Sequence, residues 1–410
     1  MELVHKKCAG LDVHKDVIVA CARIVEERGV RRELKRFGTT TTELLALADW
    51  LQKLGVTAVL MEATGIYWRP VWNVLEGMFE LTLANAAHVK NIPGRKSDVK
   101  DAEWLAELLA HGLVRGSFVP PRDIQEMREL TRTRKQLVGE ITQHCQRLQK
   151  VLETGNVRLP SVVSDILGAT GRAIIRGLAN GENDPQLLAR LAEGRLRQED
   201  KQKELVTALD GRLSPHHRFL LGFHLDTVEH LEKQVASLEA RIDEVSRPLA
   251  WAIDLLDPIP GVSRICAQMV ISEIGVDMKR FPTVGHLLSW IGLCPRSDES
   301  AGKIRSRQIR KGNRWFKGTF MQAAWAACRC KTSYYRSQYL RIKARRGAKK
   351  AVVALAASMV TAIYYMLRDG VAFQDLGPKY LEKRDKARLA AALVDRLNAL
   401  GYQVQLPAAA

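Results

Sequence analysis

Four carboxylates in the first quarter of the chain have types and surroundings suited to metal-assisted chemistry: Asp12, Glu62, Asp98 and Asp101. Asp12 lies among apolar neighbours in CAGLDVHKD, and Glu62 ends the apolar run AVLME, so burying either carboxylate without a partner would be costly. Asp98 and Asp101 are one helical turn apart and project from one helix face. Two divalent metals held about 3.5–4 Å apart by carboxylates can cleave a phosphodiester. We therefore predict that the four acids form a metal site.

Each acid also has an ordinary interpretation as a surface charge or a helix cap. Asp98 in particular would suit the first turn of a helix. Neighbouring acids that we expect to lie outside any metal site are Asp16, Glu103 and Glu107. His14 and Lys15 follow Asp12 closely, and they could approach a phosphate or belong to a solvated strand end.

Ser300 is a candidate of a different kind, because it stands in the loop SDESAGK, where Gly302 and Lys303 follow it closely. Small neighbours would let a bulky partner approach its hydroxyl, and nearby cations could stabilise the oxygens of a phosphate under attack. A serine in a polar, glycine-containing loop is also commonplace. From the residues alone, both interpretations stay open.

A dense run of positive charge follows this serine, and we predict that it forms a nucleic-acid surface. Its members are Lys303, Arg305, Arg307, Arg310, Lys311, Arg314 and Lys317. The formal net charge of +18 and the sequence pI near 9.7 are expected of a protein whose partner carries many phosphates, although a basic protein without such a partner is the alternative. Aromatic residues near the run could stack on bases or belong to a core: Trp315, Tyr334, Tyr335 and Tyr339.

The segment from Asp257 to Ala267, DPIPGVSRICA, resembles a helix-hairpin-helix turn. A bend at Gly261 would leave the free backbone N–H groups of the next helix facing outward, where they suit a phosphate. The candidate contacts are Gly261, Ser263 and Arg264. A helix-helix corner that binds nothing would carry the same sequence pattern.

The first 120 residues alternate strand and helix patterns. Strands are expected at 8–13, 17–25 and 32–37, then a helix opened by the capping box Thr40-x-x-Glu43, a strand at 58–62, a helix after Gly65, a strand at 81–84 and a helix from 98 to 109. This order is that of an α/β ribonuclease-H-like domain.

Beyond Pro121 the strand patterns disappear. Apolar residues at helical spacing, and a heptad run from Val228 to Val245, predict an all-α coiled-coil arm over 121–250. The coiled coil could form within one chain or between protomers, and the length of the heptad run favours the second. Residues 251–370 read as a mainly α-helical C-terminal domain with the helix-hairpin-helix-like element, and 371–410 as a tail.

The seven cysteines are scattered and form no CxxC pair, which argues against a disulfide framework or a zinc site and fits a reducing cytoplasm. The N-terminus carries charges where a signal peptide needs an apolar core, and no run approaches about 20 apolar residues. We therefore expect a protein that is neither secreted by that route nor membrane-spanning.

Taken together, the motifs resemble the insertion-sequence transposases of the "one-ten" family. They are GLDVHKD, MEATGIYW, KSDVKDAEWLAELL, IPGV, IGLCPRSDESAGK and RKGNRWFK. The ESAGK loop is similar to that of the "eleven-eleven" branch. The resemblance runs over nearly the whole chain, with the arm between Pro121 and Pro258 matching by position and helical character rather than by motif.

The resemblance implies a site-specific DNA recombinase of a bacterial cytoplasm. Its partner would be a non-coding guide RNA (a bridge or seek RNA) whose loops pair with donor and target DNA. Asp12, Glu62, Asp98 and Asp101 match the four acids of the family's RuvC-like domain, which hold Mg2+ or Mn2+. Ser300 matches a serine that forms a phosphoserine link to DNA. The two halves of one active site come from different protomers of a dimer or tetramer.

One departure concerns the serine loop, which reads Glu299-Ser300-Ala301-Gly302 where many relatives have paired serines before paired glycines. Ser297 is the nearby rival for the nucleophile. Two other functions compete: a metal-dependent Holliday-junction resolvase or endonuclease that hydrolyses DNA with Ser300 idle, and a non-enzymatic nucleic-acid packaging protein on a degenerate nuclease fold.

Overall fold

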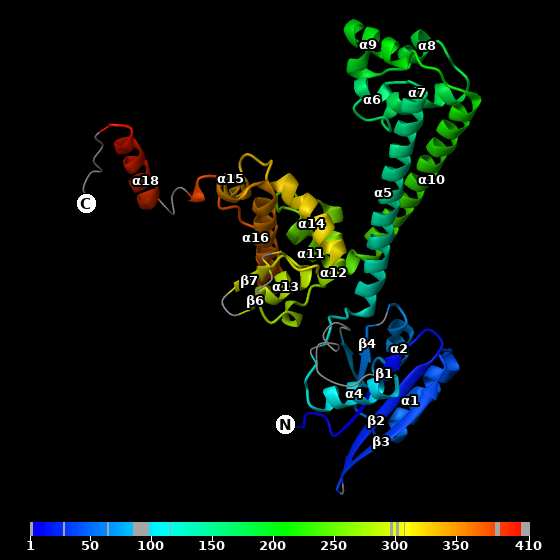
Figure 1. Ribbon diagram of the computed structural model, residues 1–410, viewed down its shortest axis with the longest axis vertical. Helices are drawn as coiled ribbons and strands as arrows, with labels where there is room; N and C mark the ends of the chain where they lie inside the picture. The colour runs from blue at the N-terminus through cyan, green and yellow to red at the C-terminus, as the bar shows by residue number, and fades with distance from the viewer. Residues whose placement is uncertain are drawn as a thin grey trace. The chain divides into compact units, whose positions relative to one another are not determined.

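The chain divides into two compact units, Met1–Val119 and Pro120–Ala410 (Figure 1). A computed structural model describes residues 3–27, 29–63, 65–84, 98–114, 116–295, 298–300, 303–306, 308–381 and 386–402. For residues 98–100, 298–300, 303–305 and 386–389 it describes the backbone alone.

The first unit is built on a five-stranded mixed sheet. Its strands are β1 (Lys7–Val13), β2 (Ile18–Glu26), β3 (Gly29–Phe37), β4 (Ala58–Glu62) and β5 (Glu80–Ala84), in the spatial order β3-β2-β1-β4-β5. The first three strands pair antiparallel, β4 runs parallel to β1, and β5 runs parallel to β4. The predicted α/β class of this part is confirmed, and β3 begins three residues earlier than the sequence pattern indicated.

Helices cover both faces of the sheet, and alternate side chains of each strand point toward one face or the other. Helices α1 (Thr41–Lys53) and α2 (Trp68–Leu75) cover one face, where Leu11 and Met61 lie in the core. Helix α4 (Asp98–Ala110) covers the other face, over Cys8 and Leu60. Because successive strand residues point to opposite faces, each second residue of β1 faces α4.

The first turn of α1 shows how the predicted capping box is realised. The Thr40 side chain accepts from the Glu43 backbone N–H, as predicted for an N-cap. The Glu43 carboxylate, however, accepts from the Gly38 N–H at 3.2 Å. It therefore fixes the chain two residues before the cap.

The second unit begins with two long antiparallel helices, α5 (Arg122–Thr154) and α10 (Pro215–Val245), which pack side by side (Figure 1). Between them in sequence lie α6 (Leu159–Val162), α7 (Ala169–Ala179), α8 (Pro185–Arg190), the short helix η1 (Gly194–Arg197) and α9 (Glu199–Leu209). These helices form an apolar core with the ends of α5 and α10. The segment between α5 and α10 therefore has a packing role.

The remaining helices are α11 (Ala250–Leu256), α12 (Arg264–Ile274), α13 (Val284–Ile291), α14 (Arg314–Ala327), α15 (Tyr334–Arg346), α16 (Ala348–Asp369) and α18 (Lys386–Ala399), with the short helices η2 (Arg247–Leu249) and η3 (Met278–Arg280). A two-stranded hairpin, β6 (Asp298–Ser300) and β7 (Lys303–Ser306), lies between α13 and α14. The prediction of a mainly helical C-terminal region is confirmed.

Helix α16 is the one helix in the described part of the chain that is long and apolar enough to cross a membrane, with a mean hydropathy of 1.6. We had expected no such segment from the sequence. Of its most apolar stretch, 56% is buried inside the protein, and the core helix of a soluble protein passes the same test.

Candidate active site

Asp12 and Glu62 lie on the α4 face of the sheet, on adjacent parallel strands. Leu11 of β1 pairs with Met61 of β4, so the next residue of each strand, Asp12 and Glu62, stand beside each other where the strands end. Asp12 is only 8% exposed, and its Oδ2 lies 2.9 Å from His14 Nε2. His14, which the sequence left undecided, is thus a direct partner of the buried carboxylate.

Gly10 brings α4 against this part of the sheet. A Cβ atom at Gly10 would lie 2.3 Å from the Ala102 carbonyl oxygen and 2.5 Å from the Ala106 nitrogen, so the helix backbone rests directly on β1. Asp101 precedes Ala102, and Gly10 is two residues from Asp12. Our sequence analysis missed this residue, although a glycine inside a strand is a recognised signal of close backbone approach.

The structure therefore gives positions for three of the four predicted acids. Asp12 and Glu62 share one face, Asp101 is half-buried on the helix that covers it, and the Asp98 side chain lies outside the described residues. Among the side chains that are described, no three of His, Cys, Asp and Glu gather around a common ion position. The donor types nevertheless fit a hard divalent cation, which takes carboxylate oxygens as ligands.

Glu107, also on α4, has a different role from these acids. Its carboxylate accepts from Arg23 Nε at 2.8 Å and from Arg32 Nη2 at 3.1 Å, and it lies 3.0 Å from His111 Nε2. The hydrogen bond from Arg23 is the main cause that lowers the pKa of Glu107 to about 2. Arg23 pairs with Cys8, four residues along β1 from Asp12 or about 13 Å. Glu107 therefore anchors α4 at the other end of the strand.

Ser300 is the last residue of β6 and pairs across the hairpin with Lys303, the first residue of β7. The hairpin stem continues through a bridge between Pro295 and Ile309 and a hydrogen bond from the Arg310 N–H to the Cys294 carbonyl at 3.3 Å. The predicted loop serine thus lies on a backbone hairpin, and its side chain is outside the described residues.

Two glycines join the base of this hairpin. Gly292 and Gly312 have φ values of +85° and +54°, and a Cβ atom at Gly312 would lie 2.2 Å from the Ile291 carbonyl oxygen. Only glycine takes such backbone conformations easily and leaves room for this contact. The outgoing and returning strands of the hairpin are therefore fixed to each other where they leave α13 and enter α14.

The basic run after the serine is exposed where its side chains are described, at Arg310, Lys311 and Arg314. Lys317 differs, because its Nζ donates to the carbonyl oxygens of Arg310 at 3.0 Å and Lys311 at 2.7 Å. The remaining members fall outside the described side chains: Lys303, Arg305 and Arg307.

The residues of the predicted helix-hairpin-helix-like turn make contacts within the protein. Gly261, at φ +83°, faces α14, where a Cβ atom would lie 2.2 Å from the Ala323 carbonyl oxygen. The Ser263 hydroxyl caps α12 by accepting from the Cys266 N–H. Arg264 donates to Asp254 at 3.1 Å. The turn therefore seats α12 against α14.

The aromatic residues near the basic run divide between core and surface. Tyr335 and Tyr339 are 4% and 7% exposed, so the interpretation of these two as stacking groups is wrong. Trp315 is half-buried, and the guanidinium groups of Arg132 and Arg314 lie 5.5 Å and 4.9 Å from its ring centre.

Comparison with known proteins gives the same family for both parts of the chain. Residues 9–156 match the DEDD transposase model of the IS110 type, and residues 253–340 match the model described as "Transposase IS116/IS110/IS902 family". These two segments together make up more than half of the chain. The DEDD match indicates a domain that depends on divalent metal in general.

Two relatives support the assignment. The uncharacterized 43.6 kDa protein of insertion element IS110 from Streptomyces coelicolor is 31% identical over 156 residues, and this match spans 37% of each chain. A candidate transposase of Sinorhizobium fredii, y4pF/y4sB, is 23% identical over 381 residues, which cover 89% of this chain and 85% of that protein. The chain belongs to the IS110 family of transposases, enzymes that cleave and recombine DNA.

Proposed function

We propose that this transposase is guided by a non-coding RNA and exchanges DNA strands through a phosphoserine intermediate at Ser300. The observation that carries the proposal is that Asp12 and Glu62 directly follow the paired residues Leu11 and Met61 of adjacent parallel strands, in a chain with two segments that match IS110-family models. The strand order β3-β2-β1-β4-β5, with only the first three strands antiparallel, supports a ribonuclease-H-like fold for the first unit.

In this proposal the acids Asp12, Glu62, Asp98 and Asp101 hold Mg2+ or Mn2+. The bound metal would neutralise charge on the phosphate oxygens during cleavage. Within the protein, the role of the rigid sheet is to keep Asp12 and Glu62 at fixed separation, and the role of Gly10 is to let Asp101 approach them. His14 would hold the Asp12 carboxylate in one orientation.

The proposed strand cleavage conserves the energy of the phosphodiester. The Ser300 hydroxyl loses its proton as Oγ attacks phosphorus, an Oγ–P bond forms, and the P–O bond to one deoxyribose breaks. The departing deoxyribose oxygen takes up a proton and leaves as a hydroxyl. Attack by a hydroxyl of a second strand reverses these changes and restores the serine, so exchange needs no external energy source.

Sequence choice in this proposal comes from base pairing between the guide RNA and the donor and target DNA. The protein then needs to bind backbone shape and charge, which agrees with the net charge of +18. We assign this binding to the exposed basic run and, at the turn before α12, to Gly261, Ser263 and Arg264. The bacterial cytoplasm is the compartment that this function requires.

Two protomers would contribute to each active site, Ser300 from one and the acids from the other. The coiled-coil pair α5 and α10 is our proposed assembly surface for a dimer or tetramer. Val235 and Leu238 continue the heptad rhythm of α10 but stay half-buried, whereas Leu231 and Ile242 on either side of them are buried. Apolar area is therefore left for a second copy along this part of α10.

The experiment is a search for a covalent protein-DNA complex that survives SDS. The protein is co-expressed with the DNA that flanks its gene, purified with its bound RNA, and given magnesium. The wild type should form the complex, while Ser300→Ala and Asp12→Asn should not, and Ser297→Ala should behave as the wild type. Cleavage without a covalent complex, unaffected by Ser300→Ala, would instead support the hydrolytic junction resolvase.

Dependence on RNA is tested on the same preparation. Digestion of the bound RNA should abolish the covalent complex, and adding back the RNA transcribed from the flanking DNA should restore it. Formation of the complex at an undiminished rate after complete digestion would exclude guidance by RNA.

A further inference from the structure

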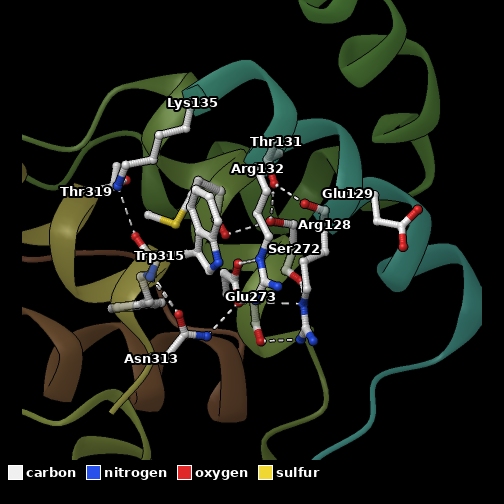
Figure 2. Close-up of polar contacts among 12 residues, drawn as sticks. Arg128, Glu129, Thr131, Arg132, Lys135, Ser272, Glu273, Asn313, Trp315 and Thr319 are labelled. Carbon is white, nitrogen blue, oxygen red and sulfur yellow. Dashed lines mark hydrogen bonds and ion pairs between the residues drawn. The ribbon is translucent and has the colours of Figure 1, made fainter. Parts of the chain in front are cut away.

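Glu273, in the last turn of α12, is a fully buried carboxylate that joins three segments distant in sequence. Its side chain is 0% exposed. Arg132 of α5 donates to both of its oxygens, from Nε at 2.7 Å and from Nη2 at 2.9 Å. Asn313, just before α14, donates from Nδ2 to Oε2 at 2.7 Å (Figure 2). The hub is defined here as Arg132, Glu273 and Asn313.

Further bonds fix the same stretch of α5 to its neighbours. Arg128 donates to the carbonyl oxygens of Ser272 at 3.0 Å and Glu273 at 2.7 Å, so it holds the end of α12 (Figure 2). Lys135, one turn beyond Arg132, donates to the Thr319 hydroxyl at 2.6 Å and thereby reaches α14. These contacts place the α5 backbone firmly beside both helices.

Asn313 connects the hub to the base of the serine hairpin. Its Oδ1 accepts from the Trp315 and Phe316 N–H groups at 2.9 Å and 3.0 Å, which caps α14. Its own N–H donates to the Trp290 carbonyl at 3.1 Å, at the end of α13. Asn313 also follows Gly312, which is in close contact with Ile291. The Glu273 carboxylate therefore holds Asn313, the residue at which the chain passes from the hairpin into α14.

We infer that Glu273, through Arg132 and Asn313, is a positioning residue that fixes the base of the Ser300 hairpin to helix α5; this inference rests on the proposed function. Apolar residues could join these helices with equal stability, because a buried ion pair repays its desolvation only in part. The ion pair and the amide instead fix the orientation of the Glu273 carboxylate, because a bidentate guanidinium and a second donor allow only one orientation.

Two variants each remove part of the hydrogen bonding to Glu273 and keep a polar side chain in the hub. Asn313→Ser keeps a residue that caps α14 well but removes the amide donor to Glu273. Arg132→Lys keeps the positive charge against Glu273 but removes the bidentate geometry. Asp184→Ser is the matched control, because Asp184 caps α8 by accepting from the Gln186 N–H and has no contact with the hub. Each folded variant is purified with its RNA, as for the wild type.

The measurements are the Kd for DNA and the single-turnover rate of formation of the Ser300–DNA complex. A misplaced nucleophile slows the reaction without weakening binding, so we expect Asn313→Ser and Arg132→Lys to lower the rate on the order of 10- to 100-fold. Their Kd values should stay within about twofold of the wild type, because both retain the exposed basic run. Asp184→Ser should change neither quantity.

The double variant tests whether the two residues act through one carboxylate. If they do, Arg132→Lys and Asn313→Ser together should slow the reaction by less than the product of their separate effects. Wild-type rates in both single variants, or rates that fall only in proportion to lost DNA binding, would overturn the positioning role while the proposed function stands. Failure of the wild type itself to form a Ser300-dependent complex would refute the proposed function and this inference with it.

Discussion

Among single residues, the carboxylates of the first unit divide by what surrounds them. Glu107 is held by Arg23 of β2, by Arg32 of β3 and by His111, which follows the end of α4, and its contribution is to stability. Asp12 is buried on the face covered by α4, beside Glu62 of the next strand, and its Oδ2 lies 2.9 Å from His14 Nε2. Structural ion pairs also perturb pKa values, so a low pKa alone does not mark the reactive acid.

Replacing Glu107 with Gln should destabilise the first unit by about 1–2 kcal/mol at neutral pH, after allowance for solvent screening. The folded pKa of Glu107, about 2, is below its ordinary value of 4.5. The stability that ionised Glu107 gives to the folded protein is therefore complete above about pH 5 and is lost as the pH falls towards 2. Thermal unfolding between pH 7 and pH 2 should show the stabilities of the variant and the wild type converging, and a difference that stays constant down to pH 2 would contradict this role of Glu107.

Sequence reasoning singles out residues by their immediate surroundings and misses those whose role depends on distant partners. Asp12 and Glu62 were singled out because a carboxylate among apolar strand residues is conspicuous, and the structure places the two on adjacent strands. The link between Glu273 and Asn313 was missed, because the two residues are 40 positions apart and meet only when α12 and the start of α14 are brought together. The sequence also left open which nearby tyrosines are core, and the structure buries Tyr335 and Tyr339 of α15.

At the level of elements, the close contact between β1 and α4 depends on Gly10, because glycine has no side chain. Gly10→Ala would place a methyl group 2.3 Å from a backbone oxygen, so we expect α4 to shift and the protein to lose about 2–3 kcal/mol of stability. Because the shift moves Asp101 away from Asp12, DNA cleavage should fall even at temperatures where the variant stays folded.

The control for this substitution is Gly139→Ala, on an exposed face of α5 where nothing lies within 4 Å of the added methyl group. Alanine favours a helix more than glycine does, so this change should stabilise the protein slightly. Urea denaturation and a cleavage assay of both variants measure the effect. Wild-type stability and activity in Gly10→Ala would show that the acids do not depend on the close approach of α4.

The pair α5 and α10 gives a prediction about assembly. Leu238→Asp places a charge in the half-buried part of the heptad run, so the mass measured by light scattering should fall to that of a smaller species. Ala236→Asp, at an exposed position of the same helix, is the control and should leave the mass unchanged. An unaltered mass in Leu238→Asp would mean that the heptads pack only within one chain.

The order of elements in the first unit was predictable because β1, β2 and β4 consist mostly of apolar residues and the first helix carries a clear cap. The helices between α5 and α10 were predicted only as part of the all-α arm, since their core forms from short helices that bury few residues each. The hairpin β6–β7 was read as a loop, because strands of three and four residues give too short a pattern to recognise.

For the whole molecule, the excess of positive charge should appear in the salt dependence of nucleic-acid binding. Replacing Arg305, Arg307 and Arg310 with Ala should weaken binding and reduce the slope of log K against log salt by about 2–3 units, one for each lost phosphate contact. Removing three exposed arginines of the arm region, Arg190, Arg195 and Arg212, gives the same change in net charge. An equal effect in both triple variants would mean that total charge, and not this run, decides binding.

The most direct test of the proposed function is to identify the atom that carries the DNA. The covalent complex formed with magnesium is digested with nuclease and protease, and the peptides are analysed by mass spectrometry. Our account predicts a nucleotide phosphate attached to Ser300, absent from the Asp12→Asn protein. A phosphate attached to Ser297 or to any other residue, or a reaction that cuts DNA and leaves every peptide unmodified, would contradict it.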